Sequence, residues 1–240
     1  MSLPLELCEN AVAHLTARHP LTAVIDEPLS SPMSPDPVGA LRVWRGAPGQ
    51  PVVKVVYVGL VVPMIRLDSH MVFAFTAADS AVPHFTLDSV YGGDYYAYHL
   101  DLIPRAELSS HLPYLDAAYQ PLTAVFTEAS AMDGLSRADI GPRQCALMSP
   151  WMLVGRATEE SFRKIGAAVS AYAEHWSALV TDGLPADVVA GLADTDLAAR
   201  DTAVRVNLFS PDVDPVWARV TRLIGEPATD RIRAELIGNG

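Results

Sequence analysis

The sequence predicts an α+β fold, an α/β/α three-layer sandwich with a central antiparallel β-sheet flanked by helices. Two observations support this prediction: short strand patterns fill residues 41–103, and helical patterns lie before and after them. Strands that follow one another directly along a chain pair as an antiparallel meander, and helices segregated from such a sheet are typical of the α+β class. Because 50% of the 240 residues are hydrophobic, we expect one globular domain spanning residues 1–240.

The N-terminal half shows a helical pattern, then a segment rich in Pro and Ser, then a series of strand patterns. Residues 3–18 carry apolar side chains at intervals of three and four, which predicts a helix. Residues 25–38 are so rich in Pro and Ser that we expect a loop. Short β-branched and aromatic runs then predict strands at 41–46, 52–62 and 71–77, followed by a hairpin over 83–103 that turns at Gly92–Gly93–Asp94.

The C-terminal half is mainly helical. Residues 158–182 give the clearest helix, with acidic residues in the first turn and Gly183 at the end. A further helix is expected over 186–204, and another helical region begins at Pro215. Between the two halves, residues 145–155 resemble one more strand.

Composition and charge exclude several classes of function. The net charge of −11 argues against a nucleic-acid partner, which needs clustered Lys and Arg. No signal peptide or membrane span is recognisable, so we expect a cytoplasmic protein without a membrane partner. The two cysteines, Cys8 and Cys145, fit a reducing compartment and are expected to be buried. No nucleotide-binding, zinc or nucleophile-elbow motif is present.

Asp88 is the first candidate catalytic residue. It follows Leu87 near the end of a strand that is otherwise aromatic and aliphatic. A carboxyl group in an apolar pocket can have its pKa raised until it carries a proton to a substrate near neutral pH. The alternative, which the sequence leaves open, is a turn residue that bonds the backbone of the next loop.

Asp201 is the second candidate. On a helix over 186–204 it shares a stripe with Val189, Ala193, Leu197 and Val204, so its carboxylate is expected on the side that faces the core. A charge on the core-facing side of a helix is costly unless it has a partner or serves a function. The alternatives are an ion pair with Arg200 or Arg205, or a helix that ends earlier.

Other polar residues of this region are weaker candidates. His99 and Asp101 share the strand face opposite Tyr98 and Leu100, which we expect to be solvated. His84 stands at the edge of a strand, and His70, beside Asp68 in a turn, is expected to face water. Arg105 follows Pro104 and could hold an anionic group of a ligand, although an exposed arginine at a helix start is the commoner case.

Several segments resemble plant red chlorophyll catabolite reductase. The segment HLDLIPRAELSSHLPYLDAAYQ is similar to one of that family, PHFTLD to its preceding strand, and SPWMLVGRATEESFRKIGAAVSAYAEHWSALV and AARDTAVRVNLFSPD to later ones. The short matches cover most of residues 40–236. The family belongs with the ferredoxin-dependent bilin reductases, whose α/β/α sandwich agrees with the fold predicted above.

The resemblance implies reduction of a linear tetrapyrrole by single electrons from ferredoxin, with no bound flavin or metal. It implies that Asp88 and Asp201 are the pocket carboxylates that donate protons, and that both open into one cavity between the sheet and the C-terminal helices. It further suggests substrate-binding roles for His84, Arg105 and His70, the last near the place where bilin reductases carry a histidine. The apolar strands would supply the walls that hold a flat ligand, including Phe73.

The partners and the function remain open at this stage. Ferredoxin is itself acidic, so a local basic patch is needed to bind it, for which the sequence offers Arg156, Arg163 and Lys164. The oligomeric state is expected to be a monomer or a homodimer.

The alternative to a reductase is a non-catalytic binding protein for a tetrapyrrole or another conjugated hydrophobic ligand on the same fold. A third possibility is isomerisation or hydrolysis of another conjugated metabolite.

Overall fold

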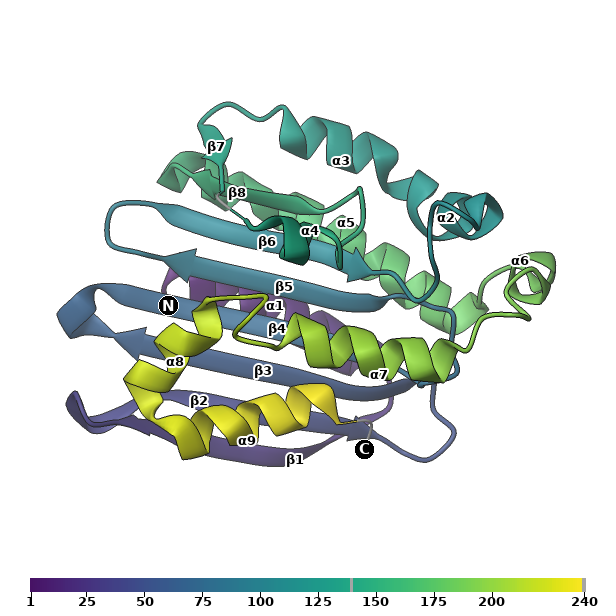
Figure 1. Cartoon of the computed structure of the whole chain (residues 1–240). Coiled ribbons are helices and arrows are strands. Elements are labelled where there is room, and N and C mark those ends of the chain that lie inside the picture. Colours follow the sequence, from purple (N-terminus) through teal and green to yellow (C-terminus); the bar gives the residue numbers. More distant parts are fainter. Residues whose placement is uncertain (139, 239–240) are drawn as a thin grey trace.

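A single eight-stranded antiparallel sheet forms the middle layer of the molecule (Figure 1). The computed structural model describes residues 1–138 and 140–238. The spatial order of the strands is β1-β2-β3-β4-β5-β6-β8-β7, so the first six follow the chain as a meander and only the last two exchange places. The strands are β1 (Leu21–Ser31), β2 (Ser34–Gly46), β3 (Val52–Val62), β4 (Leu67–Thr76), β5 (His84–Tyr91), β6 (Tyr96–Ile103), β7 (Leu135–Arg137) and β8 (Leu153–Ala157).

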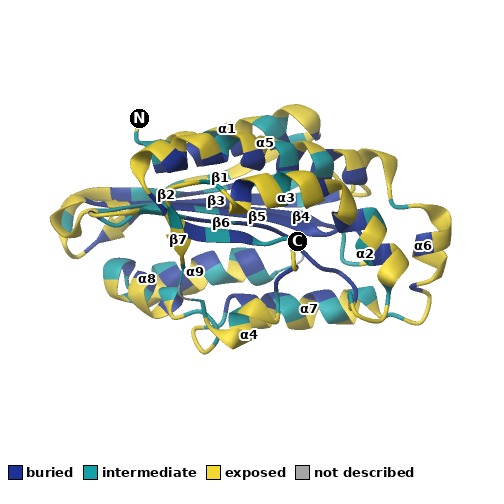
Figure 2. Ribbon diagram, turned by 90° about the horizontal axis from the view of Figure 1, so that it is seen from above, coloured by how far each residue is buried: buried dark blue, intermediate teal, exposed yellow. Residues whose placement is uncertain are grey.

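Helices cover both faces of this sheet, which confirms the predicted α/β/α class (Figure 2). The first face carries α1 (Leu3–Arg18), α3 (Thr123–Ser130) and α5 (Glu159–Asp182). The second face carries α4 (Pro142–Cys145), α7 (Leu197–Leu208), α8 (Val216–Ile224) and α9 (Glu226–Ile237). Short helices at one end of the sheet complete the chain, α2 (Leu112–Tyr119) and α6 (Ala186–Ala190).

The predicted helix over 158–182 corresponds to α5, and its ends are fixed by local chemistry. The hydroxyl oxygen of Thr158 accepts a hydrogen bond from the backbone N–H of Ser161, which caps the helix. Gly183, with φ of 76°, ends it in a backbone conformation that favours glycine. Within the described part of the chain neither α5 nor any other helix is long and apolar enough to cross a membrane.

The expected loop over 25–38 is wrong, because most of this segment belongs to the β1–β2 hairpin. Pro28 lies in β1, an edge strand that pairs on one side only, which is where proline is tolerated in a sheet. Pro35 and Pro37 lie in the part of β2 that extends beyond the pairing with β3, which begins at Gly39. The prolines are therefore tolerated at positions where one side of the strand has no partner.

Two expectations for the second half of the chain also need correction. The segment 186–204 is not one helix: α6 ends at Ala190, and α7 begins only after Asp196, whose carboxylate accepts a hydrogen bond from the Ala199 N–H. In the segment 145–155, only the last residues are in a strand, because β8 begins at Leu153. Cys145 is exposed and only Cys8 is buried.

Each face of the sheet has its own hydrophobic core. The core of the first face is built by α1 and α5 with side chains such as Phe85, Leu87 and Leu100 from the strands. The core of the second face is built by the C-terminal helices with Phe73 and Phe75. The central strands are therefore covered on both sides, and several polar residues in them, such as His84, Thr86 and Asp101, are buried.

Trp176 of α5 should be a main stabilising residue of the first core. It is fully buried, and its indole N–H donates to the carbonyl of Pro83 at 2.7 Å. We expect Trp176→Ala to lower the free energy of unfolding by about 3–5 kcal/mol in denaturant titrations. Val206→Ala, at a 46% exposed position of α7, should change it by less than about 0.5 kcal/mol; equal losses would contradict this assignment.

Candidate active site

Strand pairing gathers polar side chains of β5 and β6 on the second face. Side chains alternate along a strand, so Thr86 and Asp88 point to the same side of β5. In the register of the β5–β6 pair, Thr86 lies opposite Asp101, and Asp88 lies opposite His99. The face that carries His99 and Asp101 is covered by C-terminal helices and is not solvated, so the expectation drawn from alternation alone is wrong.

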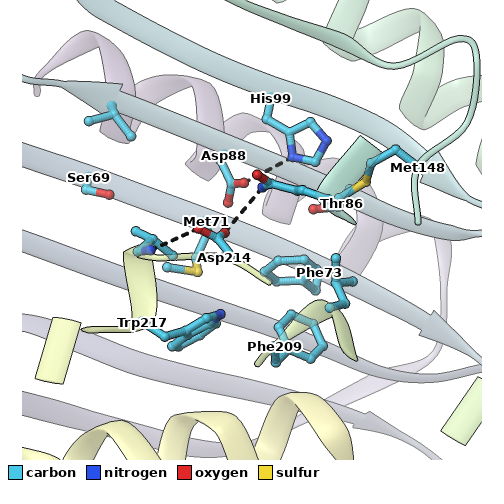
Figure 3. A pocket seen from close by; sticks show the side chains of 14 residues that line it. Ser69, Met71, Phe73, Thr86, Asp88, His99, Met148, Phe209, Asp214 and Trp217 are labelled. Carbon is cyan, nitrogen blue, oxygen red and sulfur yellow. Dashed lines mark hydrogen bonds and ion pairs between the residues drawn. The ribbon is translucent and has the colours of Figure 1, made fainter. Parts of the chain in front are cut away.

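A pocket lies over these residues, between the sheet and the C-terminal segment (Figure 3). Its cavity volume is about 130 Å³. It continues into a more open hollow of about 550 Å³ that Asp88, His99 and Asp214 also line. The lining of the inner pocket is mostly apolar and comes from Ser69, Met71, Phe73, Thr86, Asp88, Val90, His99, Gln144, Met148, Leu208, Phe209, Asp214, Val216 and Trp217.

Asp88 and His99 form an ion pair in this pocket. The distance between His99 Nδ1 and Asp88 Oδ2 is 3.2 Å, so the ring N–H donates to the carboxylate (Figure 3). Burial by itself lowers the pKa of His99, but the hydrogen bond and the negative charge of Asp88 outweigh it. Asp101 and Asp214 add to this effect, and the pKa of His99 lies above its ordinary value. The other ring nitrogen, Nε2, has no hydrogen-bond partner among the described residues.

Asp214 contributes a second carboxyl group from the loop between α7 and α8. Its Oδ1 accepts a hydrogen bond from the Val216 N–H at 2.9 Å, and its Oδ2 one from the Gln144 side chain at 3.4 Å. Burial raises the pKa of Asp214, and the charge of Asp88 raises it further. The pocket thus contains two groups with raised pKa values, the imidazole of His99 and the carboxyl group of Asp214.

Asp201 belongs to a separate, fully buried cluster. The Nδ1 atom of His84 accepts the backbone N–H of Thr76, so its Nε2–H donates to Asp201 Oδ1 at 2.6 Å. The Arg205 guanidinium donates to the same oxygen at 3.1 Å, and that of Arg105 lies 3.6 Å away. These contacts join Asp201 of α7 to His84 of β5 and hold the helix against the sheet.

The shared cavity expected for Asp88 and Asp201 is not found. Asp201 is not among the residues that line the pocket, and its side chain is only 1% exposed. Phe75 separates the two groups, with its ring centroid 5.1 Å from that of His84 and 6.4 Å from that of Phe209 in the pocket wall. The predicted ion pair with Arg205, one of the alternatives for Asp201, is confirmed.

The charges of the cluster also argue against Asp201 as a proton donor. Burial by itself raises the pKa of Asp201, but the hydrogen bond from His84 and the charges of Arg105 and Arg205 lower it to about 2. Burial lowers the pKa of His84 to about 3, and the two arginines act in the same direction. Near neutral pH the cluster therefore contains an ionised carboxylate and a neutral imidazole.

The remaining predicted ligand-binding residues are divided between the two faces. Phe73 lines the pocket. His84 and Arg105 belong to the Asp201 cluster, where Arg105 also donates to Thr76 Oγ1 at 3.2 Å and is buried, not an exposed helix-start residue. His70 lies on the first face, buried, with its ring nitrogens bonded to Tyr57 at 2.7 Å and Asp68 at 2.5 Å. It neither lines the pocket nor faces water.

The positions of His99 and Asp214 in the pocket, and the burial of Asp101 beside it, were not predicted from the sequence. The alternation of the segment HLDL placed His99 and Asp101 on one strand face correctly, and only the covering of that face was unknown. Asp214 stands in the segment SPDVDP, which has no periodicity that could indicate a pocket.

Comparison with known proteins agrees with this architecture. No protein-family model matches the sequence, and no curated protein matches it. Among solved structures, the chain is similar to phytochromobilin synthase from tomato, solved in complex with biliverdin, with a TM-score of 0.73. The similarity covers 98% of this chain and 83% of that chain, at 17% sequence identity. Similarity at this identity shows that the two proteins share a fold.

The Asp201 cluster should make the fold sensitive to acid. Folded His84 stays neutral down to about pH 3, whereas an unfolded histidine takes up a proton below about pH 6.5. Between pH 4 and 6 the unfolded chain therefore binds one more proton at this site, and stability falls as the pH falls. The unfolding equilibrium constant should rise by about tenfold per pH unit from this residue.

The measurement is a series of denaturant titrations between pH 4 and 6. His84→Gln should be less stable at pH 7 but should show a pH slope smaller by about one proton. His111→Gln, at a half-buried histidine before α2 and outside the Asp201 cluster, serves as the control and should keep the wild-type slope. An unchanged slope in His84→Gln would show that His84 is not held neutral.

Proposed function

We propose that this protein reduces a linear tetrapyrrole, such as a bilin or a chlorophyll catabolite, with single electrons from reduced ferredoxin. The observation that carries this proposal is the meeting of Asp88, His99 and Asp214 in an otherwise apolar pocket. Support comes from the fold, which is similar to that of an enzyme solved with biliverdin. The resemblance of several segments to red chlorophyll catabolite reductase supports it as well.

The chemistry of the proposed reaction needs protons as much as electrons. A conjugated tetrapyrrole that accepts one electron becomes a more basic radical anion, which a nearby acid can protonate. Two electrons and two protons together saturate one double bond. His99, protonated and oriented by Asp88, supplies one proton in this proposal, and Asp214 supplies the other. Both groups regain protons from solvent through the open hollow.

The shape of the site is compatible with a large flat ligand. Ligand pockets are commonly about 300–1,000 Å³, and the inner pocket alone is smaller than that range. The hollow of about 550 Å³ that shares its polar residues falls within it. Aromatic rings of Phe73, Phe209 and Trp217 form the inner wall, so conjugated rings would stack in the inner pocket while polar substituents extend into the hollow.

An acidic electron donor needs positive charge near the pocket. Arg219 lines the open hollow, and Arg143 and Arg156 are exposed on segments that flank it. Within the described residues, none of these three guanidinium groups forms an ion pair with a carboxylate. In this proposal ferredoxin binds at these arginines. Their local positive field would offset the net charge of −11.

The basic patch expected from sequence is therefore revised. Of its three members, only Arg156 lies near the pocket. Arg163 and Lys164 lie on α5, on the opposite face of the sheet, and are paired with Glu159 and Glu160.

The first test is a visible absorbance titration with biliverdin and with a red chlorophyll catabolite, followed by reduced ferredoxin without oxygen. We expect a spectral shift on binding and bleaching that requires both proteins. Asp88→Asn should bind the ligand but lose turnover, because the side-chain shape is kept and the ionised partner of His99 is lost. Asp94→Asn, in the exposed β5–β6 turn, is the matched control. A shift without bleaching would instead indicate a binding protein.

The second test concerns the electron donor. Arg219→Glu should raise the ferredoxin concentration needed for half-maximal rate by about tenfold at low salt, and less at high salt. Arg163→Glu, on the first face, should leave it unchanged. Equal effects of the two substitutions would contradict docking at the hollow.

A further inference from the structure

Asp101 is a buried carboxylate next to the pocket that the proposed reaction does not use directly. Its exposed fraction is 0%. Its Oδ1 accepts hydrogen bonds from the Leu102 N–H at 2.8 Å and the Ser149 hydroxyl at 2.5 Å, and its Oδ2 accepts one from the Ser149 N–H at 2.8 Å. All of these donors are neutral. Among the described residues, no lysine, arginine or histidine forms an ion pair with it.

Burying a carboxylate without an ion-pair partner costs free energy, so the surroundings of Asp101 should contain the reason for its charge. Asp101 lies two residues from His99 on the same face of β6, and His99 borders the pocket. Burial raises the pKa of Asp101 to about 6, and the charge of His99 lowers it. The negative charge of Asp101 in turn raises the pKa of His99. The two groups therefore stabilise each other in their charged forms.

We propose that Asp101 is a positioning residue that keeps His99 protonated when the pocket is filled. This inference rests on the proposed function, in which His99 donates a proton. Asp101 does not touch the ligand and acts only through the charge of the imidazole.

The other groups that face His99 explain why a buried charge is needed. Asp88 comes from β5, Asp214 from the α7–α8 loop, and Arg219 lines the hollow from α8. The side chain of Asp88 is 35% exposed, and Asp214 lines the pocket, so a ligand changes the surroundings of both. Asp101 is fully buried against Ser149 and does not line the pocket. Its charge is weakly screened because the carboxylate is buried.

Ser149 provides a control that separates charge from structure. It donates to Asp101 twice, and its hydroxyl oxygen accepts the N–H of Trp151 at 3.1 Å, so it fixes the segment that carries Met148 into the pocket wall. Ser149→Ala loosens this segment but retains the carboxyl group. Asp101→Asn loosens it and removes the charge.

The test is an NMR titration of the His99 ring in the ligand-free protein, which does not depend on any enzymatic activity. We expect Asp101→Asn to lower the pKa of His99 by about one unit, within the range measured for a neighbouring opposite charge. Ser149→Ala should lower it by less than half as much. Thermal unfolding of both variants verifies that they fold.

Turnover gives a second readout. The alkaline limb of the rate profile should move by about one pH unit towards acid in Asp101→Asn, with about tenfold loss at pH 8 and little loss at pH 5.5. If the NMR shift is found but no variant or wild-type protein reduces a tetrapyrrole, the proposed function fails and the influence of Asp101 on His99 stands. An unchanged His99 pKa, or equal shifts in both variants, would overturn the inference.

A measurement on the unmodified protein covers the case in which Asp101→Asn does not fold. Two coupled groups titrate in two steps that each group reports. The His99 ring signals and the Asp101 carboxyl signal should therefore share an inflection. Independent single-step curves would also overturn the inference.

Discussion

The site depends on one constraint, the burial of the central strands on both faces. Because side chains alternate along β5, the residues Phe85 and Leu87 enter the core of the first face, and Thr86 and Asp88 must then point to the second. A shift of one residue in the pairing would exchange the two sets and bury the carboxylate beneath α1 and α5. The hydrophobic first core thus fixes the direction of the polar groups on the second face.

The second face contains two polar clusters with opposite properties. In the cluster of Asp201 and His84, direct contacts with two arginines fix the protonation state, so the cluster anchors α7 and has no proton to exchange near neutral pH. In the pocket, neither Asp214 nor His99 forms an ion pair with an arginine among the described residues, and the pKa values of both groups are raised. Direct contact with two arginines suits a structural anchor, and polar groups with raised pKa values suit proton exchange.

The fold was largely predictable from the sequence, and the site only in part. Helix α5 and the β5–β6 hairpin follow from periodicity and turn residues, which act locally. The β1–β2 hairpin was missed because proline is judged unfavourable for strands unless the strand is known to be at an edge. Asp88 was found because a carboxylate stands out in an apolar strand. His99 was misjudged because alternation tells which residues share a face but not whether another segment covers it.

In the proposed reaction, the carboxyl groups of the pocket favour the transfer of a proton together with each electron. In the proposed reaction, an electron placed on a ligand beside Asp88 and Asp214 adds negative charge to a mostly apolar site with two carboxyl groups, which is unfavourable unless a positive charge arrives with it. A proton transferred from His99 or Asp214 satisfies this requirement, because it neutralises the reduced ligand. In the proposed reaction the carboxyl groups would couple each electron to a proton, and Asp101, on the same face of β6 as His99, would keep that proton available before the electron arrives.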